Sequence, residues 1–213
     1  MAFLRIHSKT GRNIFILMML FACIFFLGWA NSLEDIQKKS SEIKSVGARF
    51  TQEKHIQILA RPLISKGIFY FQAPDSVRWE YISPVKSILL MHKGNIRRYL
   101  ISGKGAVKDS GNAAQSMQFV LPEISRWTRG QFTDNDYFMA SFKGGKEKQV
   151  VLTPRKKELS SMISRIVITP SPDTPGVLKS VKIVEGEGNY TLLEFTDVRI
   201  NEKLNDSLFR AVQ

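Results

Sequence analysis

The sequence predicts a mainly β protein with some α-helix, built as an open antiparallel β-barrel of about eleven strands that helices close off. Three observations predict this fold. Most of the chain after residue 48 alternates between apolar and polar residues, which is the period of strands with one apolar face. The connections between these segments are short and favour antiparallel neighbours. Two short segments with helical spacing must lie on the sheet to be stable.

Residues 1–30 have the pattern of a secretory signal peptide. They carry the basic residues Arg5, Lys9 and Arg12, continue with apolar residues from Ile14 to Leu27, and end in Gly28-Trp29-Ala30, with small residues at the −3 and −1 positions before Asn31. We therefore expect residues 1–30 to be a signal peptide and residues 31–213 to be a single domain. A membrane-spanning helix needs about 20 apolar residues, so the run is short for a permanent anchor, and an uncleaved anchor is the alternative.

Cys23 is the one cysteine of the chain. The residues before it weakly resemble a lipoprotein cleavage site, but Phe21 is bulky and the residues after Cys23 would leave an apolar stub. We therefore interpret Cys23 as part of the apolar run. A mature chain that begins near Asn31 then contains no cysteine and folds without disulfide bonds, even in an oxidising compartment.

The chain is strongly basic, with 31 Lys and Arg residues against 19 Asp and Glu residues and a net charge of +12. Basic proteins often bind nucleic acid, but an exported protein rarely meets it, so we expect no nucleic-acid partner. Anionic lipid headgroups or acidic proteins are better candidate partners for this charge. The alternative is that the charge serves solubility alone.

The expected domain starts with a helix and continues with a long strand. Ser32 can cap the helix, and an apolar stripe at helical spacing covers residues 33–46, with Gly47 as the stop. Residues 48–59 then alternate imperfectly, which predicts a strand.

The stretch GIFYFQAPDSVRWEY, residues 67–81, predicts a hairpin with an aromatic face. Its large apolar side chains share one face on either side of the Pro74 turn: Phe69, Phe71, Val77, Trp79 and Tyr81. So many large apolar side chains on one hairpin either fill an ordinary core or line a cavity.

The other strands follow the same alternation. With those of the hairpin, they are expected at residues 65–72, 77–82, 86–92, 96–101, 136–142, 148–153, 162–170, 178–185, 190–198 and 207–211. The strand at 86–92 is apolar on both faces. Its alternation therefore leaves two inner faces open, either Ile88 with Leu90 or Leu89 with Met91.

The middle of the chain breaks the alternation. Residues 103–111 are rich in glycine, lysine and serine, which predicts a loop. Asn112 can cap a helix over residues 112–119 that ends at Pro122, and residues 123–129 can form a further turn.

No group of residues in the sequence predicts catalysis, so we expect a protein that is not an enzyme and uses no cofactor. His55 and His92 are isolated in the sequence and no cysteine lies near them, so no metal site is expected. The acidic pairs, such as Glu185 and Glu187, fall at expected turns and strand ends, where solvated charge is usual.

Seven strings follow one another along the chain after residue 30. They are Arg49-Phe50-Thr51-Gln52, Gly67-Ile68-Phe69-Tyr70-Phe71 before Pro74, Val77-Arg78-Trp79-Glu80-Tyr81 with Pro84, Ser87-Ile88-Leu89 before the Gly94 turn, Val150-Val151-Leu152-Thr153-Pro154, Gly188-Asn189-Tyr190-Thr191 and Leu208-Phe209. In this order and spacing they resemble the periplasmic outer-membrane lipoprotein carrier family, the LolA family.

The resemblance implies an incompletely closed antiparallel β-barrel that is covered by a helical lid. It implies a hydrophobic cavity that takes up the acyl chains of a lipoprotein, in a monomeric carrier in the periplasm of a Gram-negative bacterium. The implied partners are an ATP-driven release complex of the inner membrane and an acceptor lipoprotein of the outer membrane. The carrier itself uses no nucleotide.

The resemblance also implies which residues form the site. It favours Leu89 and Met91 over Ile88 and Leu90 as the inner face of their strand. The residues expected to line the cavity are Phe50, Phe69, Phe71, Val77, Trp79, Tyr81, Leu89 and Met91. The residues expected in the lid are Met117, Phe119, Val120 and Leu121. The alternative for each of them is an ordinary core residue.

One position departs from the family pattern. In well-known members an arginine immediately precedes the proline equivalent to Pro74 and helps to hold the lid, but this chain has Ala73 there. The same latch cannot operate, and the parity of Arg78 places that residue on the opposite face. We therefore expect the control of the lid to differ from that of those members.

Three alternatives keep the fold. One is a carrier of another acylated or polyprenyl-like product for a dedicated envelope pathway, which Ala73 and the basic surface would suit. Another is a module that senses mislocalised lipoproteins, although such modules usually have a second domain. The third is a carrier that stays tethered by residues 1–30.

Overall fold

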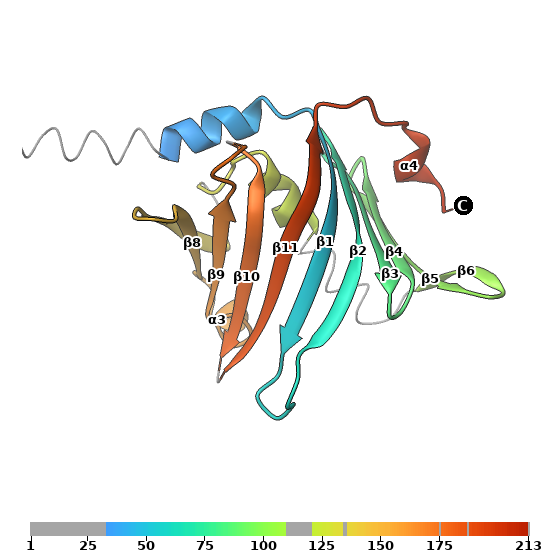
Figure 1. Cartoon of the computed structure of the whole chain (residues 1–213), viewed down its shortest axis with the longest axis horizontal. Coiled ribbons are helices and arrows are strands. Elements are labelled where there is room, and N and C mark those ends of the chain that lie inside the picture. The colour runs from blue at the N-terminus through green and yellow to red at the C-terminus, as the bar shows by residue number, and fades with distance from the viewer. Residues whose placement is uncertain (1–32, 110–120, 134–135, 175, 187, 213) are drawn as a thin grey trace, which may run out of the picture. The chain divides into compact units, whose positions relative to one another are not determined.

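The computed structural model describes residues 33–212 except for 110–120, 134–135, 175 and 187. The chain divides into two compact units, Met1–Asp35 and Ile36–Gln213, and the description below concerns the second. Figure 1 shows this unit as a strongly curved sheet of long strands with a helix on its concave side.

Eleven strands form one antiparallel sheet within the described residues. In chain order they are β1 (Ser45–His55), β2 (Leu63–Gln72), β3 (Ser76–Ser83), β4 (Ser87–His92), β5 (Asn95–Ser102), β6 (Gly105–Asp109), β7 (Phe138–Lys143), β8 (Gln149–Pro154), β9 (Arg165–Pro170), β10 (Leu178–Gly186) and β11 (Asn189–Ile200). Their order in space is β6-β5-β4-β3-β2-β1-β11-β10-β9-β8-β7. Because β6 and β7 end the sheet without pairing with each other, the barrel stays open, and the predicted fold class is confirmed.

The helical parts are short. They are α3 (Lys157–Ser160), α4 (Ser207–Arg210) and two further helical segments over residues 33–41 and 121–128. The segment 121–128 lies on the concave side of the sheet (Figure 1), and one of its faces, with Leu121, Ile124 and Trp127, is buried.

Two predictions about strands are wrong. One strand was not predicted and one predicted strand is absent, so the number of strands still agrees. Residues 105–109 form β6 instead of a loop, because Gly105 turns the chain at a φ of +104° and leads it back along β5. Residues 207–211 contain α4 instead of a strand. The backbone N–H of Ser207 donates to Asn205 Oδ1 at the start of this turn, and Phe209 becomes fully buried.

The boundaries of the predicted helices also need correction. The first helix ends at residue 41 and not at 46, because Val46 and Gly47 already pair with Phe71 and Tyr70 as part of β1. Pro122 does not end a helix, since the described segment stays helical through residue 128.

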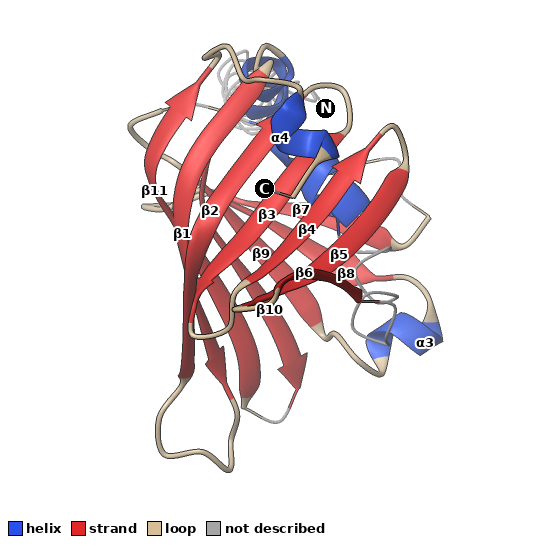
Figure 2. Cartoon of the chain, turned by 90° about the vertical axis from the view of Figure 1, so that its right-hand side faces the viewer, coloured by secondary structure: helices blue, strands red, loops and turns tan. Residues whose placement is uncertain are grey.

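The strand β4 is apolar on both faces because both of its faces are covered. Leu89 and Met91 are in register with Trp79 and Val77 of β3 and share the concave face. Leu90 points to the outer face, where α4 lies across β3 and β4 (Figure 2). Leu90 and Phe209 of α4 are both fully buried. The assignment of Leu89 and Met91 to the inner face is therefore correct.

Close backbone approach fastens the helical residues 36–41 to the rest of the unit. Gly176 has a φ of +92°, and a Cβ atom there would lie 2.8 Å from the backbone of Lys39. The hydroxyl of Ser40 donates to the carbonyl oxygen of Gly176 at 2.9 Å, and Ser40 is fully buried. Only glycine fits this conformation and this contact without strain.

Candidate functional site

A cavity of about 450 Å³ lies on the concave side of the sheet. Its wall is formed by β1, β2, β3, β4, β10 and β11 together with the helical segment 121–128. Leu121, Ile124 and Trp127 reach the cavity from this segment because residues three positions apart share one face of a helix. The volume is within the range of ligand pockets, about 300–1,000 Å³, and the mostly apolar lining is typical of them.

Aromatic rings dominate one side of the cavity. The Trp79 ring lies 5.4 Å from that of Phe69 and 6.2 Å from that of Phe195, and all three residues line the cavity. Behind Trp79, the Phe50 ring approaches it at 4.6 Å and meets Tyr81 edge-on at 5.3 Å. Tilted and edge-on contacts at these centroid distances are favourable for aromatic pairs, so the cluster holds Trp79 in place.

Another part of the cavity wall comes from β10 and β11. Val181 and Ile183 alternate inward on β10, and Leu193 and Phe195 do so on β11. The site residues predicted from the sequence include none of these four, although their alternation carries the same period-two signal as the aromatic hairpin. Their place in the cavity wall depends on the pairing of β1 with β11.

Polar side chains gather at one end of the cavity. Lys54 of β1 lies directly opposite Thr191 of β11, and its Nζ forms an ion pair with Glu185 at 3.3 Å. The Thr191 hydroxyl donates to Glu185 Oε1 at 3.1 Å. These three residues line the cavity near the ends of β1 and β10, while the helical segment 121–128 lines it elsewhere. An amphiphilic ligand could therefore place its chain among the apolar groups and its polar part here.

Tyr81 joins the aromatic cluster to a polar partner. Its hydroxyl donates to Gln52 Oε1 at 2.8 Å, and both residues line the cavity. Burial raises the pKa of the Tyr81 phenol above its ordinary value, against smaller opposing effects of the Trp79 side chain and the Arg98 charge. The phenol is therefore neutral around pH 7 and acts as a hydrogen-bond donor.

The family model described as outer membrane lipoprotein carrier protein LolA matches residues 41–212. This chain belongs to the LolA family. The match covers the whole open barrel, from the end of the first helical segment to α4, and it confirms the resemblance seen in the sequence.

Comparison with solved structures finds similar folds at low sequence identity. MucB is 11% identical with a TM-score of 0.51, over 87% of this chain and 63% of MucB. The MucA/MucB complex of Pseudomonas aeruginosa is 13% identical with a TM-score of 0.48, over 87% of this chain and 60% of that chain. A LolA superfamily protein from Nitrosomonas europaea is 10% identical with a TM-score of 0.45, over 83% of this chain and 96% of that one. No curated protein matches the chain.

The structure separates the predicted site residues of this LolA family member into two groups. Five of them line the cavity: Phe69, Trp79, Tyr81, Leu89 and Leu121. Four face the concave side but do not reach the cavity: Phe50, Phe71, Val77 and Met91. Phe50 packs behind Trp79, and the other three form an adjacent, fully covered layer. Met117, Phe119 and Val120 lie outside the described residues.

Backbone hydrogen bonds hold the turn in which Ala73 replaces the arginine of well-known family members. The backbone N–H of Ala73 donates to the carbonyl oxygen of Lys44 at 2.8 Å. The Ser125 hydroxyl, on the helical segment 121–128, donates to the carbonyl oxygen of Pro74 at 3.4 Å. A long hydrogen bond from a helix hydroxyl thus joins this segment to the turn that contains Ala73.

The Arg78 side chain lies on the outer face of the sheet, as its position in the strand alternation predicts. Its guanidinium forms an ion pair with Glu80 at 2.8 Å and donates from Nη1 to the carbonyl oxygens of Leu208 and Ala211. Arg78 is buried, with 8% of its surface exposed. It therefore holds α4 against β3 and does not contact the cavity.

Within the part of the chain that the structure describes, no group of three or more His, Cys, Asp or Glu residues is arranged to hold a metal ion. None of the helices in that same part is both long enough and apolar enough to cross a membrane.

Proposed function

We propose that this protein is a periplasmic carrier that binds the acyl chains of lipoproteins in its cavity and moves them from the inner to the outer membrane. The observation that carries the proposal is the cavity of about 450 Å³ on the concave side of the sheet, lined by Phe69, Trp79, Leu89, Leu193 and Phe195. Membership of a family described as outer membrane lipoprotein carriers supports it.

The physical chemistry of the lining suits a carrier. An acyl chain gains about 0.8 kcal/mol for each CH₂ group that it buries in a membrane, so a carrier must offer comparable apolar burial. It must also release its cargo. Contacts with Phe, Trp and Leu side chains are non-directional, so a chain can slide along them without the breaking of hydrogen bonds of fixed geometry.

The proposal includes a mature chain of residues 31–213 released by cleavage of the signal peptide, acting as a monomer without catalysis. Its partners are an ATP-driven release complex of the inner membrane and an acceptor lipoprotein of the outer membrane. The helical segment 121–128 serves as part of the lid, since its inner face forms one side of the cavity. Leu121, Ile124 and Trp127 would then move away from the sheet when cargo enters.

A second candidate is a carrier of another lipid or acylated product. Ala73 and the Ser125–Pro74 hydrogen bond favour it, because they give the lid a different attachment from that of well-known family members. The ion pair of Lys54 and Glu185 at one end of the cavity also favours it, since these groups suit a ligand with a polar part.

One experiment tests the proposal and separates the two candidates. The protein is purified from the periplasm of its own cell and the bound molecules are identified by mass spectrometry. Triacylated lipoproteins among them, together with release of lipoproteins from inner-membrane vesicles by the added protein, would support the first candidate. A different lipid, with no release of lipoproteins, would support the second. Protein that carries no lipid and takes up none would contradict both.

A further inference from the structure

The connection between β1 and β2 extends beyond the neighbouring strands and carries exposed apolar side chains. The hairpin is the lowest part of the unit in both Figure 1 and Figure 2. Ile58 near its tip is 90% exposed, and Leu63 and Ile64 where β2 begins are 54% and 49% exposed. Single apolar side chains on a surface are ordinary, but several on one projecting hairpin indicate a contact with something apolar.

The neighbouring connection adds to this group. Lys66 of β2 pairs with Ser83 of β3, which places the β3–β4 connection beside the base of the hairpin. Ile82 is 43% exposed and Val85 in that connection is 65% exposed. We call these exposed residues the apolar rim: Ile58, Leu59, Leu63, Ile64, Ile82 and Val85. The exposed Ile200, in contrast, lies at the opposite end of the sheet, where it pairs with Val46.

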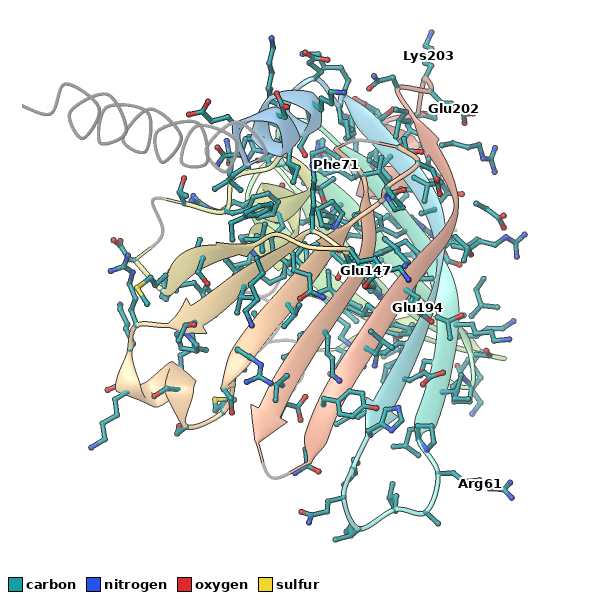
Figure 3. The ribbon with its side chains drawn as sticks, turned by 60° about the vertical axis from the view of Figure 1, so that its left-hand side comes forward. Arg61, Phe71, Glu147, Glu194, Glu202 and Lys203 are labelled. Atoms are coloured by element: carbon teal, nitrogen blue, oxygen red, sulfur yellow. The ribbon has the colours of Figure 1, made fainter. Side chains whose placement is uncertain are left out.

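Cationic side chains accompany the apolar rim. Arg61 points away from the molecule at the hairpin tip (Figure 3), and Lys66 and Lys86 lie at the bases of the two connections. Within the described residues none of these three forms an ion pair. Glu53, the acidic residue of the hairpin, is already paired with His55 at 3.1 Å. The charge at the rim is therefore positive and available to an anionic surface.

The rim lies at the same end of the sheet as the polar end of the cavity. Lys54 precedes the hairpin by two residues, and Gly188 in the β10–β11 connection packs near Gln57 of the hairpin. Met162, which lines the cavity and is 66% exposed, belongs to the connection that leads into β9 at this end. A surface that meets the rim would thus face the part of the cavity where Lys54, Glu185 and Met162 are found.

We propose that the apolar rim inserts into the surface of an anionic bilayer, so that the cavity exchanges its ligand directly with that bilayer. Aliphatic side chains on separate projecting connections, with unpaired cations beside them, match the apolar interior and anionic headgroups of such a surface. The β1–β2 hairpin projects beyond the neighbouring strands (Figure 1 and Figure 2), which suits insertion into a fluid surface. The inference goes beyond the proposed carrier function, because it places one exchange step at the lipid itself and not at a protein partner.

A site-specific probe tests the insertion. In the whole chain with Cys23→Ser, Ile58→Cys is labelled with a polarity-sensitive fluorophore, and Ile200→Cys provides the matched control at the other end of the sheet. With vesicles that contain phosphatidylglycerol, we expect a blue shift at residue 58 and quenching by nitroxide-labelled lipid, with neither at residue 200. The comparison of two positions removes any general binding of residues 1–30 to the vesicles. Ile58 is 90% exposed, so its replacement leaves the fold intact.

A charge variant tests the role of the cations. Arg61→Gln should lower the partition of the residue-58 probe into anionic vesicles about fivefold, the effect of one basic residue at such a surface. Lys203→Gln, at the opposite end (Figure 3), should leave it unchanged. Equal responses at residues 58 and 200 would overturn the proposal. So would a blue shift that needs no lipid and grows with protein concentration, since this would identify a second copy of the chain as the occupant. The assay contains no cargo, so its failure is distinguishable from failure of the carrier function.

Discussion

The ring of Phe50 on β1 occupies the space that a side chain at residue 67 of β2 would need. Phe50 and Gly67 are register partners, and a Cβ atom at residue 67 would lie 2.5 Å from Phe50 Cζ and closer still to the carbonyl oxygen of Glu80. The same ring supports Trp79 at 4.6 Å between centroids. Gly67 thereby allows the aromatic side of the cavity to pack against the sheet.

Gly67→Ala should destabilise the protein strongly. Overpacking costs about 1–3 kcal/mol, and a methyl group that meets backbone on one side and a packed ring on the other has no direction in which to relax, so we expect about 3 kcal/mol. Urea unfolding measures the loss. Gly103→Ala is the matched control, because nothing lies within 4 Å of its Cβ position. Equal stability of the two variants would contradict the close contact.

Arg78→Gln should loosen the C-terminal segment. It removes the ion pair with Glu80 and the hydrogen bonds to Leu208 and Ala211 from a buried position, which we expect to cost about 2 kcal/mol in the free energy of unfolding. Arg210→Gln breaks an ion pair with Asp206 in which both side chains are 57% exposed, and should cost less than about 0.5 kcal/mol. Proteolysis near residue 207 should accelerate in the first variant alone.

The stability of the protein should fall at alkaline pH through Tyr81. The folded pKa of its phenol is raised above 10.0, so the unfolded chain loses this proton first and is favoured as the pH rises beyond about 10. Below that pH the contribution is fully present. Tyr81→Phe should cost about 1 kcal/mol at pH 8 through the lost hydrogen bond to Gln52, and this cost should shrink as the pH rises above 10.0. Unfolding in urea at each pH measures it, with Tyr137→Phe as the control; a cost that is constant with pH would refute the assignment.

Trp79→Glu should prevent uptake of ligand while leaving the protein folded or mildly destabilised. The change puts a carboxylate among apolar side chains and removes the ring that contacts Phe69 and Phe195, so an acyl chain should bind at least about tenfold more weakly. Displacement of a fluorescent fatty-acid probe measures the affinity. Tyr137→Glu introduces the same charge at a residue that is 41% exposed and outside the cavity lining. Wild-type affinity in the Trp79 variant would remove Trp79 from the binding site.

The alternation of residues along a strand predicts which face of the sheet a side chain lies on. It does not predict whether that side chain reaches the cavity. Phe69, Trp79 and Tyr81 share a parity with Phe71 and Val77, and all five lie on the concave face. Only the first three reach the cavity, because register and the helical segment 121–128 determine which layer remains open. The alternation of residues in a single hairpin predicts neither the register of the strands nor the position of the helical segment.

The position of α4 also explains why the sequence pattern does not predict which face of β4 points into the barrel. Ile88, Leu89, Leu90 and Met91 give no preference for either face, because α4 covers the outer one. The contact of α4 with this face depends on Phe209. The short apolar segment around Phe209 is compatible with a strand or with a helical turn. Contact with β3 and β4 and the hydrogen bonds from Arg78 select the helical turn.

The pairing of β1 with β11 has a consequence for how the protein is made. Val46, near the start of the domain, finds its partner in Ile200, so the centre of the sheet cannot be completed until nearly the whole chain is available. Contacts between such distant segments make folding slow. Until β11 arrives, β1 and β10 both present unpaired backbone edges that can join to other chains. During synthesis the protein therefore has its greatest need for protection from aggregation before its last strand, β11, has emerged.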